Sequence, residues 1–308
     1  MNANLVPPSD ADLRKLDIFF SDDFAVVLGV KKSVMDDGRN DWDEATRLDM
    51  LGNVYLRRNA MEADEQQEIV WSRFCALYLP AAINRFIDPP KIPTEDPKEI
   101  AKFRLFSPCS EMLVQTQHNA YFAKYLRSKS PLAANGKRLP RIVAERIAEL
   151  GTAWEPELRR PTSRDLAEHY EGILASAVQL LCTLQTAYIK ELDQESVVPG
   201  ELRRKLQPLL QGWSNRYRGT ILGDASVRVL LNWSPESGDS WFRDYAKTVR
   251  KHTLGWDVCG LSSCEVTTGL KACSKCHTVR YCSTPHQVMH WKMPSGARHS
   301  QLCHKTEY

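Results

Sequence analysis

The sequence lacks the features that direct a chain to a membrane or out of the cell. Residues 1–8 have neither the basic start nor the apolar stretch of a secretory signal. No apolar run approaches the ~18 residues needed to cross a bilayer, and the longest one is residues 24–30. We therefore expect a soluble intracellular protein of the nucleus or cytoplasm, without a membrane partner.

A strong charge of one sign is also missing. The formal net charge is +3, and it is concentrated near the end of the chain, where residues 251–308 hold seven Lys/Arg against three Asp/Glu. This excess is too small to indicate nucleic-acid binding. A helix that reads DNA presents several basic or amide side chains on one face, and residues 283–293 offer only Lys292 in that capacity. Nucleic acid is therefore an unlikely partner class.

Recognisable catalytic motifs are absent as well. The chain has no phosphate-binding loop, no dinucleotide-binding glycine pattern and no nucleophile elbow. The acidic residues of the first 250 positions follow the pattern of solvated helix faces. We therefore expect a protein that is not an enzyme.

Residues 1–253 carry the periodicity of helices. The clearest helix is predicted over residues 164–192, where apolar residues recur every three or four positions. A second is bracketed by Pro140 and Gly151, and a third is predicted over residues 65–87, kinked at Pro80. Further helices are expected near residues 10–20, 42–58, 97–106, 110–127, 200–211 and 238–252, and loops at residues 88–93, 128–138 and 234–239.

These patterns predict an all-α N-terminal domain over residues 1–253, followed by a small module over residues 254–308. The 43% apolar content is sufficient for a buried core in the larger part. The helices could close into a bundle or stack as an irregular solenoid of helical hairpins, and both arrangements fit the pattern.

Cysteine and histidine are present in quantity only near the end of the chain. Cys75, Cys109 and Cys182 lie in apolar or isolated surroundings and are expected to be small buried hydrophobes. The other six of the nine cysteines fall in the last fifty residues, and six of the eight histidines lie beyond residue 251. In a chain without a secretory signal, this clustering indicates metal ligands before disulfides.

The tail contains eight good zinc ligands. Their order is Cys259-x4-Cys264-x8-Cys273-x2-Cys276-x5-Cys282-x3-His286, followed by His299-x3-Cys303. Zinc prefers four thiolate or imidazole ligands in a tetrahedron, so eight ligands predict two closed, structural sites and two Zn²⁺ per chain. His290 is an alternative to His299, because it lies one helical turn after His286. His277 and His304 are expected to face solvent.

The segment Cys273-Ser-Lys-Cys-His-Thr-Val-Arg-Tyr-Cys282, followed by His286-Gln287, Trp291 and His299-x3-Cys303, resembles the MYND zinc finger family. In that family the two zinc sites interleave along the chain. The resemblance therefore implies two ligand sets, which are Cys259, Cys264, Cys282 and His286 for one ion, and Cys273, Cys276, His299 and Cys303 for the other.

The tail departs from the family pattern at three places. The first ligand pair is separated by four residues where two are usual, and His286 stands where cysteine is commoner. Imidazole is also a good zinc donor, so His286 can still supply the fourth ligand of a tetrahedral site. Seven residues lie between Trp291 and His299 where the family has two, and this insert includes Pro294 and Gly296.

The resemblance also implies a function. MYND fingers typically bind short proline-containing peptides of partner proteins, and Ser274, Gln287 and Trp291 match the family's groove positions. An indole offers a flat apolar face to a proline ring, while an amide and a hydroxyl can pair with an extended peptide backbone. In the competing interpretation, Trp291 is the core of a tiny domain and Gln287 an ordinary surface residue.

MYND fingers also occur in lysine methyltransferases of the SET class and beside an iron-dependent prolyl hydroxylase domain. Neither the Asn-His pair of the first nor the His-x-Asp motif of the second is present around His118, His169 or His252. The sequence thus predicts a zinc-binding adaptor for protein partners, consistent with a role in transcriptional regulation. A divergent methyltransferase and a nucleic-acid-binding zinc finger are the alternatives.

Overall fold

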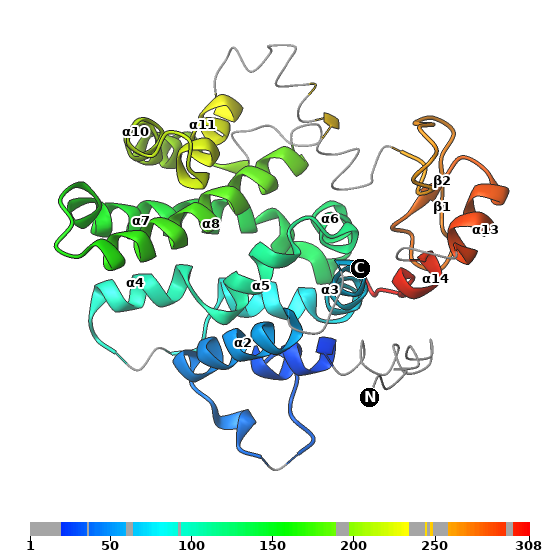
Figure 1. The fold of residues 1–308 in the computed structure, drawn as a ribbon, viewed down its shortest axis with the longest axis horizontal. Helices are drawn as coiled ribbons and strands as arrows, with labels where there is room; N and C mark the ends of the chain where they lie inside the picture. Colours follow the sequence, from blue (N-terminus) through cyan, green and yellow to red (C-terminus); the bar gives the residue numbers. More distant parts are fainter. Residues whose placement is uncertain are drawn as a thin grey trace, which may run out of the picture. The chain divides into compact units, whose positions relative to one another are not determined.

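The chain is helical almost throughout its described part. The computed structural model describes residues 20–35, 37–59, 64–91, 94–188, 197–233, 244, 247–248, 258–293 and 298–308. Within these ranges the only strands are β1 (Lys271–Ala272) and β2 (Arg280–Tyr281), which form one antiparallel pair (Figure 1). The predicted all-α fold with a small C-terminal Cys/His module is confirmed. No helix in the described part combines the length and apolar character needed to span a bilayer.

The chain divides into two compact units. One comprises residues 1–79 and 258–306, and the other comprises residues 80–257 and 307–308. The boundary predicted between residues 253 and 254 lies outside the described residues and stays a prediction.

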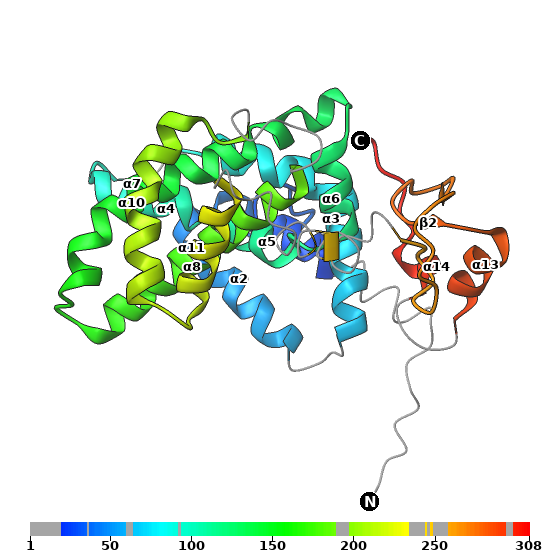
Figure 2. The ribbon, with the colours of Figure 1, turned by 90° about the horizontal axis from the view of Figure 1, so that it is seen from above.

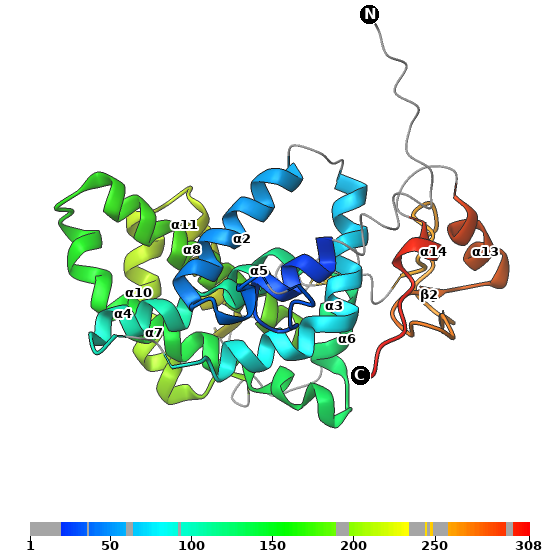
Figure 3. The same cartoon turned by 90° about the horizontal axis from the view of Figure 1, so that it is seen from below.

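The N-terminal part of the first unit is organised around a buried arginine. Residues 20–27 are helical, and they are followed by the 3₁₀ turn η1 (Arg39–Asp41), α2 (Glu44–Asn59) and the beginning of α3 (Asp64–Ile87) (Figure 3). The Arg47 side chain is 4% exposed. Its guanidinium donates to five backbone carbonyls at 3.0 to 3.3 Å, those of Val26, Val27, Arg39, Asn40 and Trp42.

Those five bonds hold the end of the first helix and the following loop against α2. Gly29 has a φ of 68°, and a Cβ added there would lie 2.9 Å from Arg47 Cζ. Only glycine combines this left-handed backbone with so close an approach. One charged side chain therefore links the end of the first helix to η1 and to the start of α2.

The second unit is a helical bundle. Its elements are α4 (Pro97–Leu105), α5 (Pro108–Thr116), α6 (Ala120–Arg127), η2 (Pro131–Lys137), α7 (Leu139–Arg159), α8 (Arg164–Tyr188), α10 (Gly200–Arg216) and α11 (Ile221–Trp233). Contacts run from α7 to α8, from α8 to α11, from α11 to α10 and from α10 back to α7 (Figures 1 and 2). Because these contacts close a ring, the bundle is observed here rather than an open solenoid.

Helix α7 is longer than predicted, because Gly151 does not end it. A Cβ added at Gly151 would lie 2.6 Å from the Trp213 indole, and Trp213 is fully buried. The glycine lets α10 approach α7 closely, so it serves packing rather than termination. The Trp213 Nε1 donates to Glu155 at 2.8 Å, which keeps the buried indole paired.

Other expected elements differ in their bounds. The single helix predicted over residues 110–127 is two helices, because Asn119 breaks the run by capping α6 through its side chain. The loop predicted over residues 128–138 contains η2, and α11 was not predicted at all. α3 continues through Pro80, where the kink stays a prediction. Several expected elements lie wholly or partly outside the described ranges. They are the helices expected near residues 10–20 and 238–252, the last residues of the helix over 164–192, and the loop over 234–239, together with residues 92–93 of the loop over 88–93.

Candidate metal centre

A short β-hairpin forms the centre of the C-terminal module. Lys271 pairs with Tyr281, and Ala272 pairs with Arg280. The turn between the strands contains the Cys273–Cys276 pair, where Cys273 N donates to Val279 O and His277 N donates to Cys273 O, both at 2.9 Å. His277 has a φ of 54°, so the chain makes a tight left-handed turn there. The turn brings the thiols of Cys273 and Cys276 to the same side.

Two short helices supply the histidines. α13 (Thr284–Lys292) begins after Ser283, whose hydroxyl accepts from His286 N, and it has a proline in its first turn. This start places His286 in the first turn of the helix, beside Cys282. α14 (His299–Leu302) then carries the fully buried His299.

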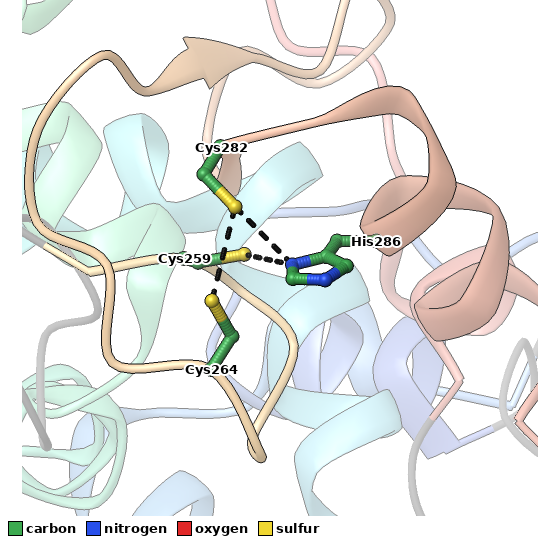
Figure 4. Close-up of side chains that lie close together, drawn as sticks. All are labelled: Cys259, Cys264, Cys282 and His286. Carbon is green, nitrogen blue, oxygen red and sulfur yellow. Dashed lines mark hydrogen bonds between the residues drawn. The ribbon is translucent and has the colours of Figure 1, made fainter.

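The first cluster contains Cys259, Cys264, Cys282 and His286 (Figure 4). The His286 Nδ1 lies 3.2 Å from Cys282 Sγ and 3.6 Å from Cys259 Sγ. The Cys264 and Cys282 sulfurs are 3.8 Å apart. The four-residue spacing between Cys259 and Cys264 does not prevent both from joining this cluster. Cys259 N donates to Val266 O at 2.9 Å, and Cys264 N donates to Leu261 O at 2.8 Å. These two hydrogen bonds fold the loop back on itself.

The second cluster contains Cys273, Cys276, His299 and Cys303, and all four residues are buried. The Cys273 and Cys303 sulfurs are 3.8 Å apart, and Cys276 Sγ lies 3.6 Å from His299 Nε2. The backbone N–H of Thr278 donates to Cys276 Sγ at 3.4 Å. A donor to this sulfur stabilises the thiolate form that a metal requires.

These separations fit tetrahedral zinc. Four ligands at zinc–sulfur distances of about 2.3 Å and zinc–nitrogen distances of about 2.0 to 2.1 Å give edges of about 3.8 Å between sulfurs and about 3.6 Å between sulfur and nitrogen. One sulfur pair in each cluster is separated by 3.8 Å, and two of the sulfur–nitrogen pairs by 3.6 Å, while the Cys282–His286 pair is closer at 3.2 Å. Disulfide sulfurs would lie about 2.05 Å apart, and all nine cysteines are free thiols.

The electrostatics of the second cluster suit a bound cation. Burial, reinforced by the neighbouring Cys276 and Cys273 thiolates, raises the pKa of Cys303 above its ordinary value. Burial lowers the pKa of His299 to about 4, so its imidazole is neutral at pH 7. A divalent ion bound among these ligands would balance the negative charge of the thiolates and favour the deprotonated form of Cys303.

Residues 258–303 match the family model of the MYND finger. Neither the curated proteins nor the solved structures contain a match to the chain. Together with the two clusters, the match establishes the C-terminal module as a MYND finger that binds two zinc ions. Its pairing of ligands is the interleaved one that the resemblance implied.

A glycine that the sequence pattern did not single out links the first ligand loop of the MYND finger to its β-hairpin. Gly260 N donates to Arg280 O at 2.7 Å, which links the first ligand loop to β2. A Cβ at Gly260 would lie 2.2 Å from Val279 Cγ1, so no larger residue fits without a shift. The only indication of this role in the sequence is that Gly260 directly follows the ligand Cys259.

The remaining histidines lie outside the clusters. The His290 ring pairs with the buried Tyr281, whose hydroxyl is 3.0 Å from His290 Nδ1, and the structure gives the seventh ligand position to His299. His277 is exposed as expected, whereas His304 is half-buried rather than solvent-facing. Cys75, Cys109 and Cys182 are buried among helices. In the described part of the chain, the two MYND clusters are the only groups suited to hold a metal.

The three expected groove residues lie on the surface of the MYND finger. Ser274 is exposed in the turn between Cys273 and Cys276, and Gln287 is half-buried on α13. Trp291 is 38% exposed, and its ring meets the His299 ring at 5.7 Å and 68°. Trp291 is therefore supported at one edge without being enclosed as a core residue.

His286 is expected to be replaceable by cysteine but not by alanine. His286→Cys should retain two zinc ions, because a thiolate can occupy the same corner of the tetrahedron. His286→Ala should reduce the zinc content toward one ion per chain, because the first cluster keeps only three protein ligands. Metal analysis after dialysis checks both variants, and His277→Ala serves as the control. An alanine variant that holds two ions as tightly as the unmodified chain would mean that another residue is the ligand.

Proposed function

We propose that this protein is an intracellular adaptor whose MYND finger binds a short proline-containing segment of a partner protein. The observation that carries the proposal is the partly exposed indole of Trp291, held beside the second zinc cluster. A fixed aromatic face is suited to a proline ring, and it loses little conformational freedom on binding. Transcriptional regulation, in the nucleus or in the cytoplasm, is the setting we propose for such an adaptor.

The zinc sites support binding rather than catalysis. Each cluster provides four protein ligands, the number that fills a tetrahedral zinc. Catalytic zinc instead keeps a position open for water or substrate. We therefore propose that the MYND finger has no catalytic role and that the helical units act as its scaffold.

The two alternative functions have weaker support. A methyltransferase would need a cofactor site, and the sequence contains no glycine-rich pattern for one. For nucleic-acid reading, α13 offers Lys292 as its single Lys or Arg, whereas a recognition helix needs several such side chains. A protein partner is the class that an exposed indole with flanking polar groups favours.

Trp291→Ala is expected to remove most peptide binding. The full chain should bind an uncharged proline-rich peptide in the micromolar range, roughly −8 kcal/mol, and the variant should lose at least about tenfold in affinity, the effect of removing a central aromatic contact. Trp291→Phe should keep part of the peptide affinity that Trp291→Ala loses, since a flat apolar ring remains. Isothermal titration with zinc content checked in each sample is the measurement.

Ile221→Ala, which removes an exposed apolar side chain from α11, is the matched control and should bind as the unmodified chain does. Binding to the uncharged peptide should change little with salt, because it relies on stacking and backbone hydrogen bonds. Binding to a mixed oligonucleotide that weakens by orders of magnitude as salt rises, with no peptide binding, would refute the proposal.

A further inference from the structure

The positive side-chain charge of the MYND finger exceeds the negative charge of its two zinc sites. Residues 258–306 contain six Lys/Arg and a single acidic residue, Glu265. Six thiolates and two Zn²⁺ together contribute a charge of −2. The folded, zinc-loaded MYND finger is therefore net positive, and its partner is expected to be complementary.

Two of the six cations lie next in sequence to Ser274 and Trp291, two of the expected groove residues. Lys292 follows Trp291 directly at the end of α13, and it is exposed. Lys275 lies in the turn between Ser274 and Cys276, and it is exposed as well.

The second zinc cluster brings the turn of Lys275 close to Trp291. Cys276 Sγ is 3.6 Å from His299 Nε2, and the Trp291 ring is 5.7 Å from the His299 ring. The residue after Lys275 and the residue before Lys292 thus contact the same buried histidine. Two segments that are separate in the sequence, the turn that contains Lys275 and the end of α13 that contains Lys292, therefore meet at the second zinc cluster.

Both lysines are available to a partner. Neither Lys275 nor Lys292 has an ion-pair partner among the described residues. Some lysines elsewhere in the chain are paired, for example Lys31 with Asp22 at 2.6 Å and Lys205 with Glu201 at 3.1 Å. Exposed, unpaired ammonium groups at the rim of an apolar contact select a partner of opposite charge and speed its association.

We propose that the partner segment carries acidic side chains next to its proline, and that Lys275 and Lys292 bind those acidic groups. This inference rests on the proposed function, because the acidic residues are placed relative to a proline held by Trp291. A peptide is favoured over nucleic acid, because two separate lysines around one indole match a short acidic segment better than a run of phosphates.

The test compares three peptides of equal length on the full, zinc-loaded chain. All three share one proline-containing core, flanked by glutamates, by serines or by lysines. The glutamate peptide should bind about five- to tenfold more tightly than the serine peptide at low salt, as expected for two exposed charge pairs. The lysine peptide should bind more weakly than the serine peptide. In about 1 M NaCl, where the screening length falls to about 3 Å, the three affinities should converge.

The double variant Lys275→Gln/Lys292→Gln should lose the preference for glutamates but keep the affinity for the serine peptide. The matched control is Lys98→Gln/Lys137→Gln, which removes the same charge from exposed positions of the helical unit and should keep the preference. Zinc content should remain at two ions in both.

The outcomes separate this inference from the proposed function. Equal affinity for all three peptides, or a glutamate preference that survives the Lys275/Lys292 double variant, would overturn the inference while leaving proline binding in place. Failure of every peptide to bind would overturn both. Preferential, steeply salt-dependent binding of an oligonucleotide through the same lysines would also overturn the inference, in favour of a phosphate partner.

Discussion

Cys276→Ala is expected to unfold the MYND finger and to leave the helical bundle folded. Cys276 is fully buried, its sulfur lies 3.6 Å from His299 Nε2, and it accepts a backbone hydrogen bond from Thr278. Binding of a structural zinc contributes of order 10 kcal/mol to the folding of so small a module. A segment of this size cannot bury enough apolar surface to replace that contribution.

Two measurements check this expectation. The zinc content should fall from two ions per chain, and limited proteolysis should cleave within residues 258–303, which match the MYND family. The far-UV helical signal and its cooperative melt should persist, because α7, α8, α10 and α11 pack on one another within the unit that holds none of the zinc ligands. Cys182→Ala, at a buried thiol outside both clusters, should keep two ions. Loss of the helical melt together with the zinc would mean that finger and helices share one core.

Arg47→Leu is expected to destabilise the N-terminal part of the chain by about 2 to 4 kcal/mol, since a buried carbonyl left without a donor costs about 1 to 3 kcal/mol. The substitution removes all five hydrogen bonds of the guanidinium and leaves the carbonyls of Val26 and Val27 without this donor. Val26 O still accepts from Gly29 N at 2.9 Å, but a buried carbonyl that loses its donor carries a desolvation cost that leucine cannot offset. Arg47→Lys should rescue only part of the loss, because an ammonium cannot reach five acceptors spread over a planar fork.

Urea unfolding of the full chain gives the size of the effect. Arg141→Leu is the matched control, because Arg141 is exposed and pairs with Glu145 on the same helix at 2.7 Å. Surface pairs of this kind contribute about 0.3 to 0.5 kcal/mol. An Arg47 variant no less stable than the Arg141 variant would contradict the role given to the buried guanidinium.

Much of the helical fold was predictable, because apolar periodicity and proline positions are local signals. Residues 164–188 and 65–87 are helical as that periodicity indicates. The errors fall where a residue serves a distant neighbour. Gly151 has the sequence signature of a helix end, yet it lies inside α7 because it makes room for Trp213 of α10. Sequence spacing cannot report that contact, since it depends on how two helices cross.

For the metal centre, the sequence by itself determined the chemistry. The number and order of cysteines and histidines near the end of the chain specify thiolate and imidazole ligands, and hence zinc, whatever the exact folding of the tail. The same residues specify that the tail depends on metal, because it has too little apolar surface to fold otherwise.

Only the tertiary structure decided which ligands share an ion and which side chains remain for a partner. His290 and His299 are both plausible ligands by spacing, and the structure separates them because Tyr281 pairs with His290 while His299 faces Cys276. Trp291 reads equally well as core or as surface until α13 leaves it 38% exposed. The physical reason is the same in each case. Spacing along a chain defines which groups can approach each other, but the reversal of the β-hairpin and the packing of the helices define which groups do.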